Sequence, residues 1–472
     1  MTQKQLVNVK DATLLISGYE FGPDISKIII SLSHPVENVS KDGITIIADT
    51  VKREISDIYL SNKEGDRVLC DSNYITIELA IIFDQKNRLF NFNPTTHHDE
   101  WVSEYITHIS FHVIINGRES LVSFEGDYIN NRICPATEQF KNRGTFSGQY
   151  KNPITKKMES LNLKYAAFEP IQIKEDNVKN PLIIWLNGRG EGGADIDIVL
   201  LGNKVTALAS SEIQTFFTTE NGENGSYVLV IQCPTYWMDD GDGRVSQGDL
   251  VSLYTEILMD MIKDYVSKNK DVDPNRIYLG GCSNGGYMAM NMLISYPNYW
   301  AASYQICEAY SYMLLKRDKE GNYIYEEEGN HLTEIEQTDK RWFTPDKINK
   351  IKNIPIWFVQ SEDDRLVIPW RYSLPAYKEL LKAGAKNCWY SYFESIEGVD
   401  IPGMKYLGHW SWVPLFNVQV TKVQDREKIL ASDDKKEFGF VPCNDGGGCQ
   451  EAADENRSYK NIFEWLNAQV KH

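Results

Sequence analysis

Long apolar runs are missing from this sequence of 472 residues. No stretch approaches the roughly 18 consecutive apolar residues that a membrane-spanning helix requires. Residues 1–10 also contain no apolar segment of the kind found in a secretory signal peptide. We therefore expect no membrane partner, whereas the native compartment stays open because a leader can be removed from a mature chain.

Positive charge is in deficit, since 49 lysines and arginines are outnumbered by 66 aspartates and glutamates, and the formal net charge is −17. A protein of this sign repels the phosphate backbone of a nucleic acid instead of neutralising it. We therefore expect no nucleic-acid partner.

Patterns that hold metals or nucleotide cofactors are also missing. The eight cysteines are scattered and no Cys-x-x-Cys pair accompanies them, which argues against zinc. Cys443 and Cys449 lie close enough to form a small disulfide, or they serve as ordinary small apolar residues. The glycine-rich run 188–193 lacks the acidic residue of a dinucleotide site, and the acidic run 239–243 lacks the final glutamate of a calcium loop. We predict no metal and no cofactor.

The N-terminal part alternates short apolar and polar positions in segments separated by Gly, Asp, Asn and Pro. Val, Ile, Thr and Tyr dominate these segments, which is typical of strands in two packed antiparallel sheets. The pattern predicts a β-sandwich domain over residues 1–140, with strands near 13–17, 27–32, 43–48, 74–81 and 106–115.

From residue 141 to 472 the pattern changes to short, wholly apolar runs separated by helical patterns. This alternation is typical of a parallel sheet covered on both faces, so we predict an α/β domain. The expected strands are 161–168, 181–186, 227–232, 276–280, 301–306, 355–360 and 389–393, and the expected helices are 250–268, 375–382 and 462–470. Two polar stretches, 310–350 and 420–457, interrupt the alternation and are either a lid or substrate wall or plain solvated excursions.

One motif carries the chemistry. Residues 276–290 pass from an apolar strand into a helix through Gly281-Cys282-Ser283-Asn284-Gly285. In this G-x-S-x-G pattern the serine lies on a sharp strand-to-helix turn that exposes its Oγ. The N–H of Asn284, at the start of the helix, points to an oxyanion site. We interpret Ser283 as a nucleophile, with a glycine-rich structural turn as the alternative.

A serine nucleophile needs a base, and in this type of sheet the partners follow in the order Ser, acid, His. The only histidines after the strand 355–360 are His409 and the terminal His472. His409 lies in a glycine-preceded loop after the last expected strand, so we predict that it is the general base.

The acid should follow the strand 355–360, where Glu362, Asp363 and Asp364 compete. The spacing to the following Val-Ile-Pro favours Asp364, and Asp363 is the alternative.

A second oxyanion donor should come from the loop after the strand 181–186. The N–H of Arg189 is the first choice and that of Gly190 the second, because the neighbouring glycines let this backbone approach a substrate carbonyl. The side chains beside these loops either shape an acyl or sugar pocket or belong to the core; they are Trp237, Glu308, Tyr310, Trp410 and Trp412.

With these motifs in view, the chain resembles the bacterial esterases of the prolyl oligopeptidase-like family of serine hydrolases. The likeness extends over nearly the whole chain and rests on residues 18–23, 186–193, 276–287, 383–387 and 408–412. It implies an immunoglobulin-like sandwich over 1–140, an α/β-hydrolase fold over 141–472, and Ser283, Asp364 and His409 as a catalytic triad. Asn187 and Ser361 depart from the family pattern, where histidine and glycine are common, but neither change removes a catalytic group.

The resemblance implies a serine carboxylesterase, with some relatives acting on feruloyl or acetyl esters of plant polysaccharide and often exported. We therefore expect a small-molecule or polysaccharide-linked ester as substrate. A serine peptidase with the same triad is one rival, although the chain is too short to carry the propeller of prolyl oligopeptidases. A carbohydrate-binding protein with an inactive hydrolase fold is another. The acyl group, the alcohol and the oligomeric state remain open.

Overall fold

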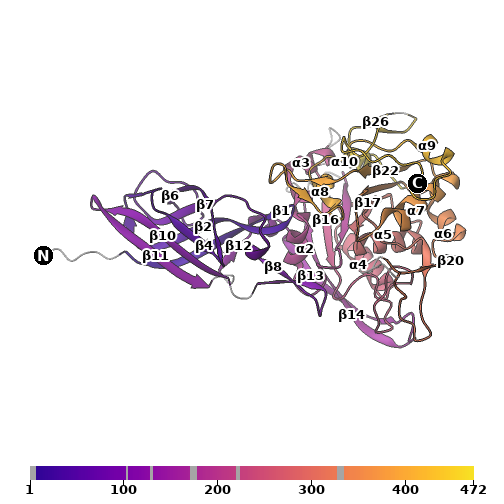
Figure 1. The fold of residues 1–472 in the computed structure, drawn as a ribbon, viewed down its shortest axis with the longest axis horizontal. Helices are drawn as coiled ribbons and strands as arrows, with labels where there is room; N and C mark the ends of the chain where they lie inside the picture. The colour runs from indigo at the N-terminus through magenta and orange to yellow at the C-terminus, as the bar shows by residue number, and fades with distance from the viewer. Residues whose placement is uncertain are drawn as a thin grey trace. The chain divides into compact units, whose positions relative to one another are not determined.

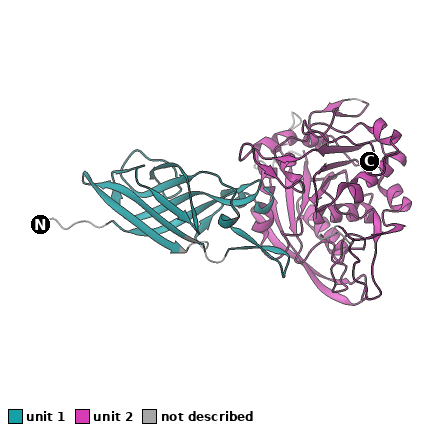
Figure 2. Ribbon diagram, in the orientation of Figure 1, with its two compact units in different colours: residues 1–139, 201–204 teal, residues 140–200, 205–472 magenta. Residues whose placement is uncertain are grey.

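The computed structural model describes residues 7–102, 105–127, 131–170, 178–218, 224–326, 334–455 and 457–471. They form two compact units (Figure 2): residues 1–139 with 201–204, and residues 140–200 with 205–472. Each unit contains its own sheets, and Figure 1 labels many of their strands.

The first unit is a β-sandwich, as predicted. One sheet has the strand order β12-β1-β2-β7-β6 and the other has the order β11-β10-β4-β5, with β3 paired to β10. Alternate residues enter the core, so Ile28 and Ile30 of β2 and Ile75 and Ile77 of β7 are all fully buried. The strands are β1 (Val9–Tyr19), β2 (Gly22–Val36), β3 (Asn38–Val39), β4 (Thr45–Ala48), β5 (Val51–Lys52), β6 (Ile55–Ser61), β7 (Ser72–Leu79), β10 (Ile106–Ile115), β11 (Arg118–Asp127) and β12 (Arg132–Ile133). A hairpin of β8 (Phe90–Asn93) and β9 (His98–Trp101), the 3-10 helix η1 (Gln85–Asn87) and the helix α1 (Pro135–Glu138) complete the unit.

The second unit is built on a mostly parallel sheet of eight strands, in the order β13-β14-β16-β15-β17-β18-β21-β22. The pairs β13–β14 and β14–β16 are antiparallel, and every later pair is parallel. The central strands are apolar throughout because both faces of the sheet are covered. The strands are β13 (Asn142–Lys151), β14 (Met158–Phe168), β15 (Asn180–Leu186), β16 (Tyr227–Gln232), β17 (Val272–Cys282), β18 (Ala302–Ile306), β21 (Ile356–Ser361) and β22 (Cys388–Phe393).

Helices cover this sheet (Figure 1). Helix α4 contacts β13 and β14, α5 contacts β15, β17 and β18, and α7 contacts β22. The helices are α2 (Ile196–Gly202), α3 (Ser211–Gln214), α4 (Thr255–Lys268), α5 (Asn284–Ser295), α6 (Pro345–Ile351), α7 (Ser373–Lys382), α8 (Trp412–Phe416), α9 (Arg426–Ala431) and α10 (Ile462–Asn467), with 3-10 helices η2 (Val205–Ala209), η3 (Thr215–Phe217) and η4 (Pro369–Arg371). Among the described helices, none combines the length and apolar character needed to cross a bilayer.

The two polar stretches fold onto the second unit. The first contains the strand pair β19 (Met313–Leu315) and β20 (Gln337–Arg341) and ends in α6. Its residues 327–333, which include Glu327 and Glu328, lie outside the described residues. The second contains α9 and the pair β25 (Ala452–Ala453) and β26 (Ser458–Tyr459); the short pair β23 (Ile396–Glu397) and β24 (Lys405–Tyr406) precedes it.

Several sequence interpretations are decided by the fold. The predicted strands of the α/β domain are all present. The polar residues that precede the first of them contain a further edge strand, β13, which we had not predicted. Its residues alternate between partly buried and exposed, so it lacks the apolar run that marks its neighbours. Cys443 and Cys449 are free thiols, so the disulfide considered for them is not formed. In the acidic run 239–243, Asp239 accepts a hydrogen bond from the Gly241 N–H at 2.9 Å, which makes this run an acidic turn.

Candidate active site

Ser283 lies between β17 and α5 in a strained backbone conformation. Its φ is 54° and its ψ is −114°, a combination that non-glycine residues rarely adopt. Hydrogen bonds hold the residue on both sides, because its N–H donates to the Ile306 carbonyl at 2.9 Å and its carbonyl accepts from the Tyr287 N–H at 2.9 Å. The sequence motif therefore folds into the sharp turn that we predicted for it.

The glycines around Ser283 have a steric reason. A Cβ on Gly281 would lie 2.7 Å from the Leu186 carbonyl oxygen, and one on Gly285 would lie 2.7 Å from the Asn187 carbonyl oxygen. Both distances are far inside van der Waals contact, so strand β15 and the loop after it can pass the turn only where side chains are absent.

His409 and Asp364 form a hydrogen-bonded pair. Nδ1 of His409 lies 2.9 Å from Oδ2 of Asp364, and both side chains are buried. The other oxygen, Oδ1, accepts from the N–H groups of Leu366 and Val367, each at 2.9 Å. The carboxylate is thus fixed in place with its remaining oxygen directed at the imidazole, which selects the tautomer that leaves Nε2 as the acceptor.

The competing carboxyl, Asp363, has a different partner. Its Oδ1 accepts a hydrogen bond from the Ser361 hydroxyl at 2.5 Å. Of the two candidate acids, Asp364 is the one that contacts His409.

Cys307 connects the two halves of the site, and the sequence reasoning missed it. Its thiol lies against the Ser283 backbone N–H, and burial raises the pKa of this thiol well above its ordinary value. Sγ of Cys307, a carboxylate oxygen of Asp364 and a ring nitrogen of His409 all lie within 4.8 Å of one another. Because it directly follows β18, next to β17, Cys307 could have been found from the rule that active-site groups gather at the carboxyl ends of parallel strands.

The Ser283 hydroxyl and His409 are not hydrogen-bonded to each other within the described residues. Contacts of this kind are often long in the absence of substrate. The catalytic roles of the three residues therefore remain predictions.

The loop after β15 lies beside the start of α5. Asn187 fastens it, since its Oδ1 accepts from the Cys233 N–H at 3.1 Å and its carbonyl accepts from Trp237 Nε1 at 3.1 Å. Asn284 is held in turn by the Trp237 N–H, which donates to its Oδ1 at 2.5 Å. Arg189 and Gly190 follow on this loop and are partly exposed.

The predicted substrate residues occupy different environments. Trp237 is fully buried and packs edge-on against Tyr254 at 6.0 Å, so it supports the loop after β15 from inside. Glu308 is also buried; Oε2 accepts from the Tyr310 N–H at 2.6 Å, while Oε1 has no hydrogen-bond partner in the part of the chain that the structure describes. Burial raises the pKa of Glu308 to about 8.

Trp410 and Trp412 extend from His409 as an aromatic row. The Trp412 ring meets His409 edge-on at 5.9 Å and stacks on Trp410 at 5.9 Å, and Trp410 is tilted against Tyr406 at 5.0 Å. Trp412 is buried, whereas Trp410 is partly exposed. The row thus leads from the surface to the imidazole.

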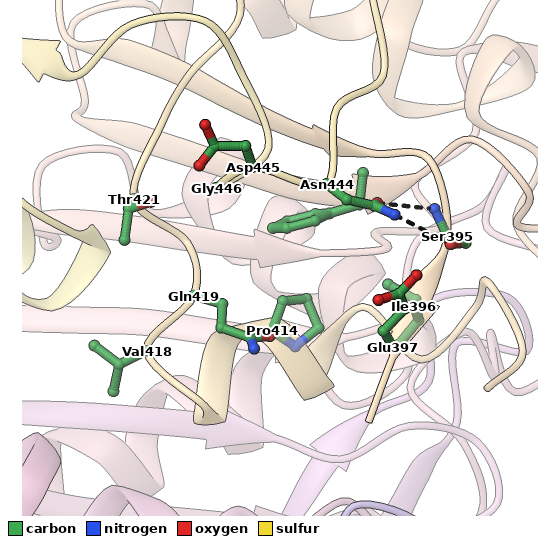
Figure 3. Close-up of a pocket in the computed structure, with 11 residues that line it drawn as sticks. Ser395, Ile396, Glu397, Pro414, Val418, Gln419, Thr421, Asn444, Asp445 and Gly446 are labelled. Carbon is green, nitrogen blue, oxygen red and sulfur yellow. Dashed lines mark hydrogen bonds between the residues drawn. The ribbon is translucent and has the colours of Figure 1, made fainter. Parts of the chain in front are cut away.

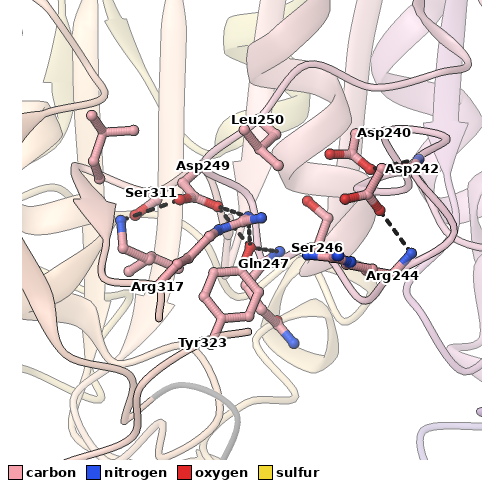
Figure 4. A network of polar contacts seen from close by, with 12 residues as sticks. Asp240, Asp242, Arg244, Ser246, Gln247, Asp249, Leu250, Ser311, Arg317 and Tyr323 are labelled. Carbon is pink, nitrogen blue, oxygen red and sulfur yellow. Dashed lines mark hydrogen bonds and ion pairs between the residues drawn. The ribbon is translucent and has the colours of Figure 1, made fainter. Parts of the chain in front are cut away.

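Hydrogen bonds and ion pairs to the buried Asp249 and Arg371 hold the first polar stretch in place, and Figure 4 shows those of Asp249. Asp249 accepts hydrogen bonds from the Tyr323 hydroxyl at 2.8 Å and the Leu315 N–H at 3.2 Å, and it pairs with Arg317 at 3.3 Å. Arg371, in the segment that follows Asp364, pairs with Glu326 at 2.7 Å. The described part of this stretch is therefore an ordered wall.

A separate pocket of about 360 Å³ lies beyond the end of β22 (Figure 3). The Asn444 side chain accepts from the N–H groups of Glu394 and Ser395 on one side of it. None of the predicted catalytic residues lines this pocket.

Comparison with known proteins identifies both parts of the chain. Residues 11–120 match the esterase Ig-like N-terminal domain, and residues 257–395 match the prolyl oligopeptidase family. No curated protein matched the chain by sequence.

Among solved structures, a thermostable esterase is 20% identical, with a TM-score of 0.60 over 87% of this chain and 96% of its own. This likeness shows a shared fold. A ferulic acid esterase is 12% identical with a TM-score of 0.35 (58% of this chain, 97% of its own), and an acylaminoacyl peptidase is 14% identical with a TM-score of 0.36 (88% of this chain, 55% of its own). These two scores are too low to establish more. The chain is thus a serine hydrolase in which a domain similar to the esterase Ig-like N-terminal domain precedes an α/β-hydrolase domain, whose residues 257–395 are similar to the prolyl oligopeptidase family.

Proposed function

We propose that the protein is a serine carboxylesterase that works through an acyl-enzyme. Ser283 is the nucleophile, His409 the general base and Asp364 the acid that orients the imidazole. The supporting observation is the 2.9 Å contact between His409 and Asp364, next to a serine held at a φ of 54°.

The reaction has two balanced halves. His409 Nε2 takes the Ser283 proton as Oγ attacks the ester carbonyl, and the imidazolium then gives that proton to the departing alcohol. Water next attacks the acyl-enzyme, with His409 again taking a proton and returning it to Ser283 as the carboxylic acid leaves. In both halves the N–H groups of Asn284 and Arg189, or of Gly190 as the second choice, hold the tetrahedral oxyanion.

The substrate is an ester of a small acid, with acetyl and feruloyl esters of plant polysaccharide as the first candidates. The partly exposed Trp410, stacked on Trp412 beside His409, offers a flat surface for an aromatic acyl group or a sugar ring.

The test is hydrolysis of 4-nitrophenyl acetate, butyrate and ferulate beside matched peptide amides. We expect the esters to be cleaved and Ser283→Ala to lower kcat on the order of 10⁴-fold or more. A fluorophosphonate probe should label Ser283 in the unmodified protein. Turnover unchanged in Ser283→Ala would remove the proposal, and preferred cleavage of the amides would favour the peptidase.

A further inference from the structure

Among the described residues, the guanidinium group of Arg189 has no acidic partner. The side chain is partly exposed, and its buried Nε has no hydrogen-bond partner among the described residues. Its guanidinium carbon lies 4.7 Å from the centre of the Tyr236 ring. The groups that act electrostatically on this charge are two phenols, those of Tyr236 and Tyr325.

Arg189 pairs with none of the described acidic residues, although the sequence contains 66 of them in all. The buried Arg53, by contrast, donates two hydrogen bonds to Asp24, at 3.0 and 2.9 Å. Removing a charge from water without a partner costs free energy, and burial lowers the pKa of Arg189 accordingly. A half-buried guanidinium that pairs with none of the described carboxylates can bind an anionic ligand.

The position of Arg189 ties it to the proposed reaction. It lies two residues after Asn187, whose carbonyl oxygen approaches Gly285 on the turn that presents Ser283. Its stacking partner Tyr236 precedes Trp237, whose N–H holds the Asn284 side chain. Arg189 and its stacking partner Tyr236 therefore belong to loops that meet at the start of α5.

The ordered wall, which is the described part of residues 310–350, approaches the Arg189 side chain through Tyr325. Tyr325 follows Tyr323, whose hydroxyl is fixed by Asp249 at 2.8 Å and accepts from the Gln247 N–H at 3.0 Å. The bridge between Tyr325 and Ile335 continues the wall past this point. With one face of the guanidinium on Tyr236, its N–H edge remains for a planar acceptor, which suits a carboxylate.

We propose that the Arg189 side chain binds a carboxylate on the substrate, so that the enzyme selects esters that carry a negative charge close to the scissile carbonyl. The inference rests on the proposed esterase function and adds a specificity determinant to it. It is separate from the oxyanion role of the Arg189 backbone N–H, which a side-chain substitution retains.

Two matched pairs of esters test the inference and locate the charge. The acyl-side pair is 4-nitrophenyl hydrogen adipate and its methyl ester. The alcohol-side pair is 4-acetoxybenzoate and its methyl ester. We expect kcat/KM to favour the charged member of one pair by about tenfold or more, since an arginine–carboxylate contact is a strong hydrogen bond.

Arg189→Gln should abolish this preference, and Arg189→Lys should restore part of it. Arg244→Gln is the matched control, because it removes the same charge from the loop that carries Tyr236, while its own side chain bonds to the Glu320 carbonyl. The control should keep the preference of the unmodified protein. Equal rates within both pairs, or a preference that survives Arg189→Gln, would overturn the inference.

Binding separates this inference from the esterase proposal. Calorimetric titration of Ser283→Ala with 4-acetoxybenzoate and with hydrogen adipate measures recognition without turnover. If none of the esters is cleaved, the esterase proposal fails. Binding of either acid that is lost in Arg189→Gln would then still support the arginine site. If neither acid binds, the inference about Arg189 is overturned.

Discussion

At the scale of single residues, the site depends on groups held in costly states. The conformation of Ser283 costs on the order of 1–3 kcal/mol, and the backbone hydrogen bonds to Ile306 and Tyr287 keep it in place. Asp364 is buried, and the N–H groups of Leu366 and Val367 compensate its desolvation. Such groups are tolerated only where the surrounding packing fixes them in place.

The two candidate acids can be separated by substitution. Asp364→Asn keeps the shape but loses the acceptor that selects the His409 tautomer, so we expect kcat for ester hydrolysis to fall by about 10³–10⁴-fold. Asp363→Asn removes the charge of a group that bonds to the Ser361 hydroxyl and not to His409, and we expect a fall of less than about tenfold. Steady-state kinetics on 4-nitrophenyl acetate measure both; the reverse order would assign the role to Asp363.

Glu308 should make stability depend on pH. Its pKa of about 8 in the folded protein lies above the ordinary value of 4.5. Between these two pH values the folded protein keeps a proton on this carboxyl group, whereas the unfolded chain has released it. The free energy of unfolding contributed by this group therefore falls as pH rises from about 4.5 to about 8.

Glu308→Gln removes this titration. Relative to the unmodified protein, we expect the free energy of unfolding of this variant to rise by up to a few kcal/mol as the pH increases from about 4.5 to about 8. Above about pH 8 the difference should stay constant. Urea unfolding at a series of pH values from 5 to about 9 measures the difference. Parallel curves for the two proteins would contradict the expectation.

At the scale of elements, the strands that carry the site could be predicted from the sequence because both of their faces are buried. Strands β15, β16, β17, β18, β21 and β22 each contain a buried, mainly apolar segment, and that segment was predicted in each. Strand β13 was missed, since it sits at the sheet edge and alternates like an exposed hairpin. A strand is thus easier to predict from its hydrophobic pattern when more of its surface is buried.

The ordered wall offers an element-scale prediction. Asp249→Ala removes the shared partner of Leu315, Arg317 and Tyr323, so we expect a loss of about 2–4 kcal/mol of stability and faster proteolysis within residues 311–341. Asp242→Ala is the control, because Asp242 Oδ1 accepts from the Arg244 N–H on its own turn. Equal proteolysis of the two variants would show that Asp249 does not hold this stretch.

At the scale of the whole molecule, the chain forms two compact units with separate cores. Ile77→Ala opens a cavity in the fully buried core of the first unit and should cost that unit about 2–5 kcal/mol. We expect calorimetry to show the corresponding transition at a lower temperature, while fluorophosphonate labelling of the second unit at 25 °C is retained. A single transition that moves as a whole would indicate that the two units unfold together.

The sequence by itself determined the fold class, the sandwich and the strained serine turn. These features depend on local spacing, namely periodic apolar positions and glycines that flank one serine, so they can be read without knowing which segments meet. The family resemblance rested on the same local runs.

Only the tertiary structure decided which of the two neighbouring acids contacts His409 and that Cys307 lies close both to the Ser283 backbone and to the imidazole. It also decided that Arg189 stacks on Tyr236 with no acidic partner among the described residues. These are contacts between segments that are distant in the chain. The physical reason is that a side chain's partners depend on how loops are directed at the sheet edge, and hydrophobic periodicity carries no information about that direction.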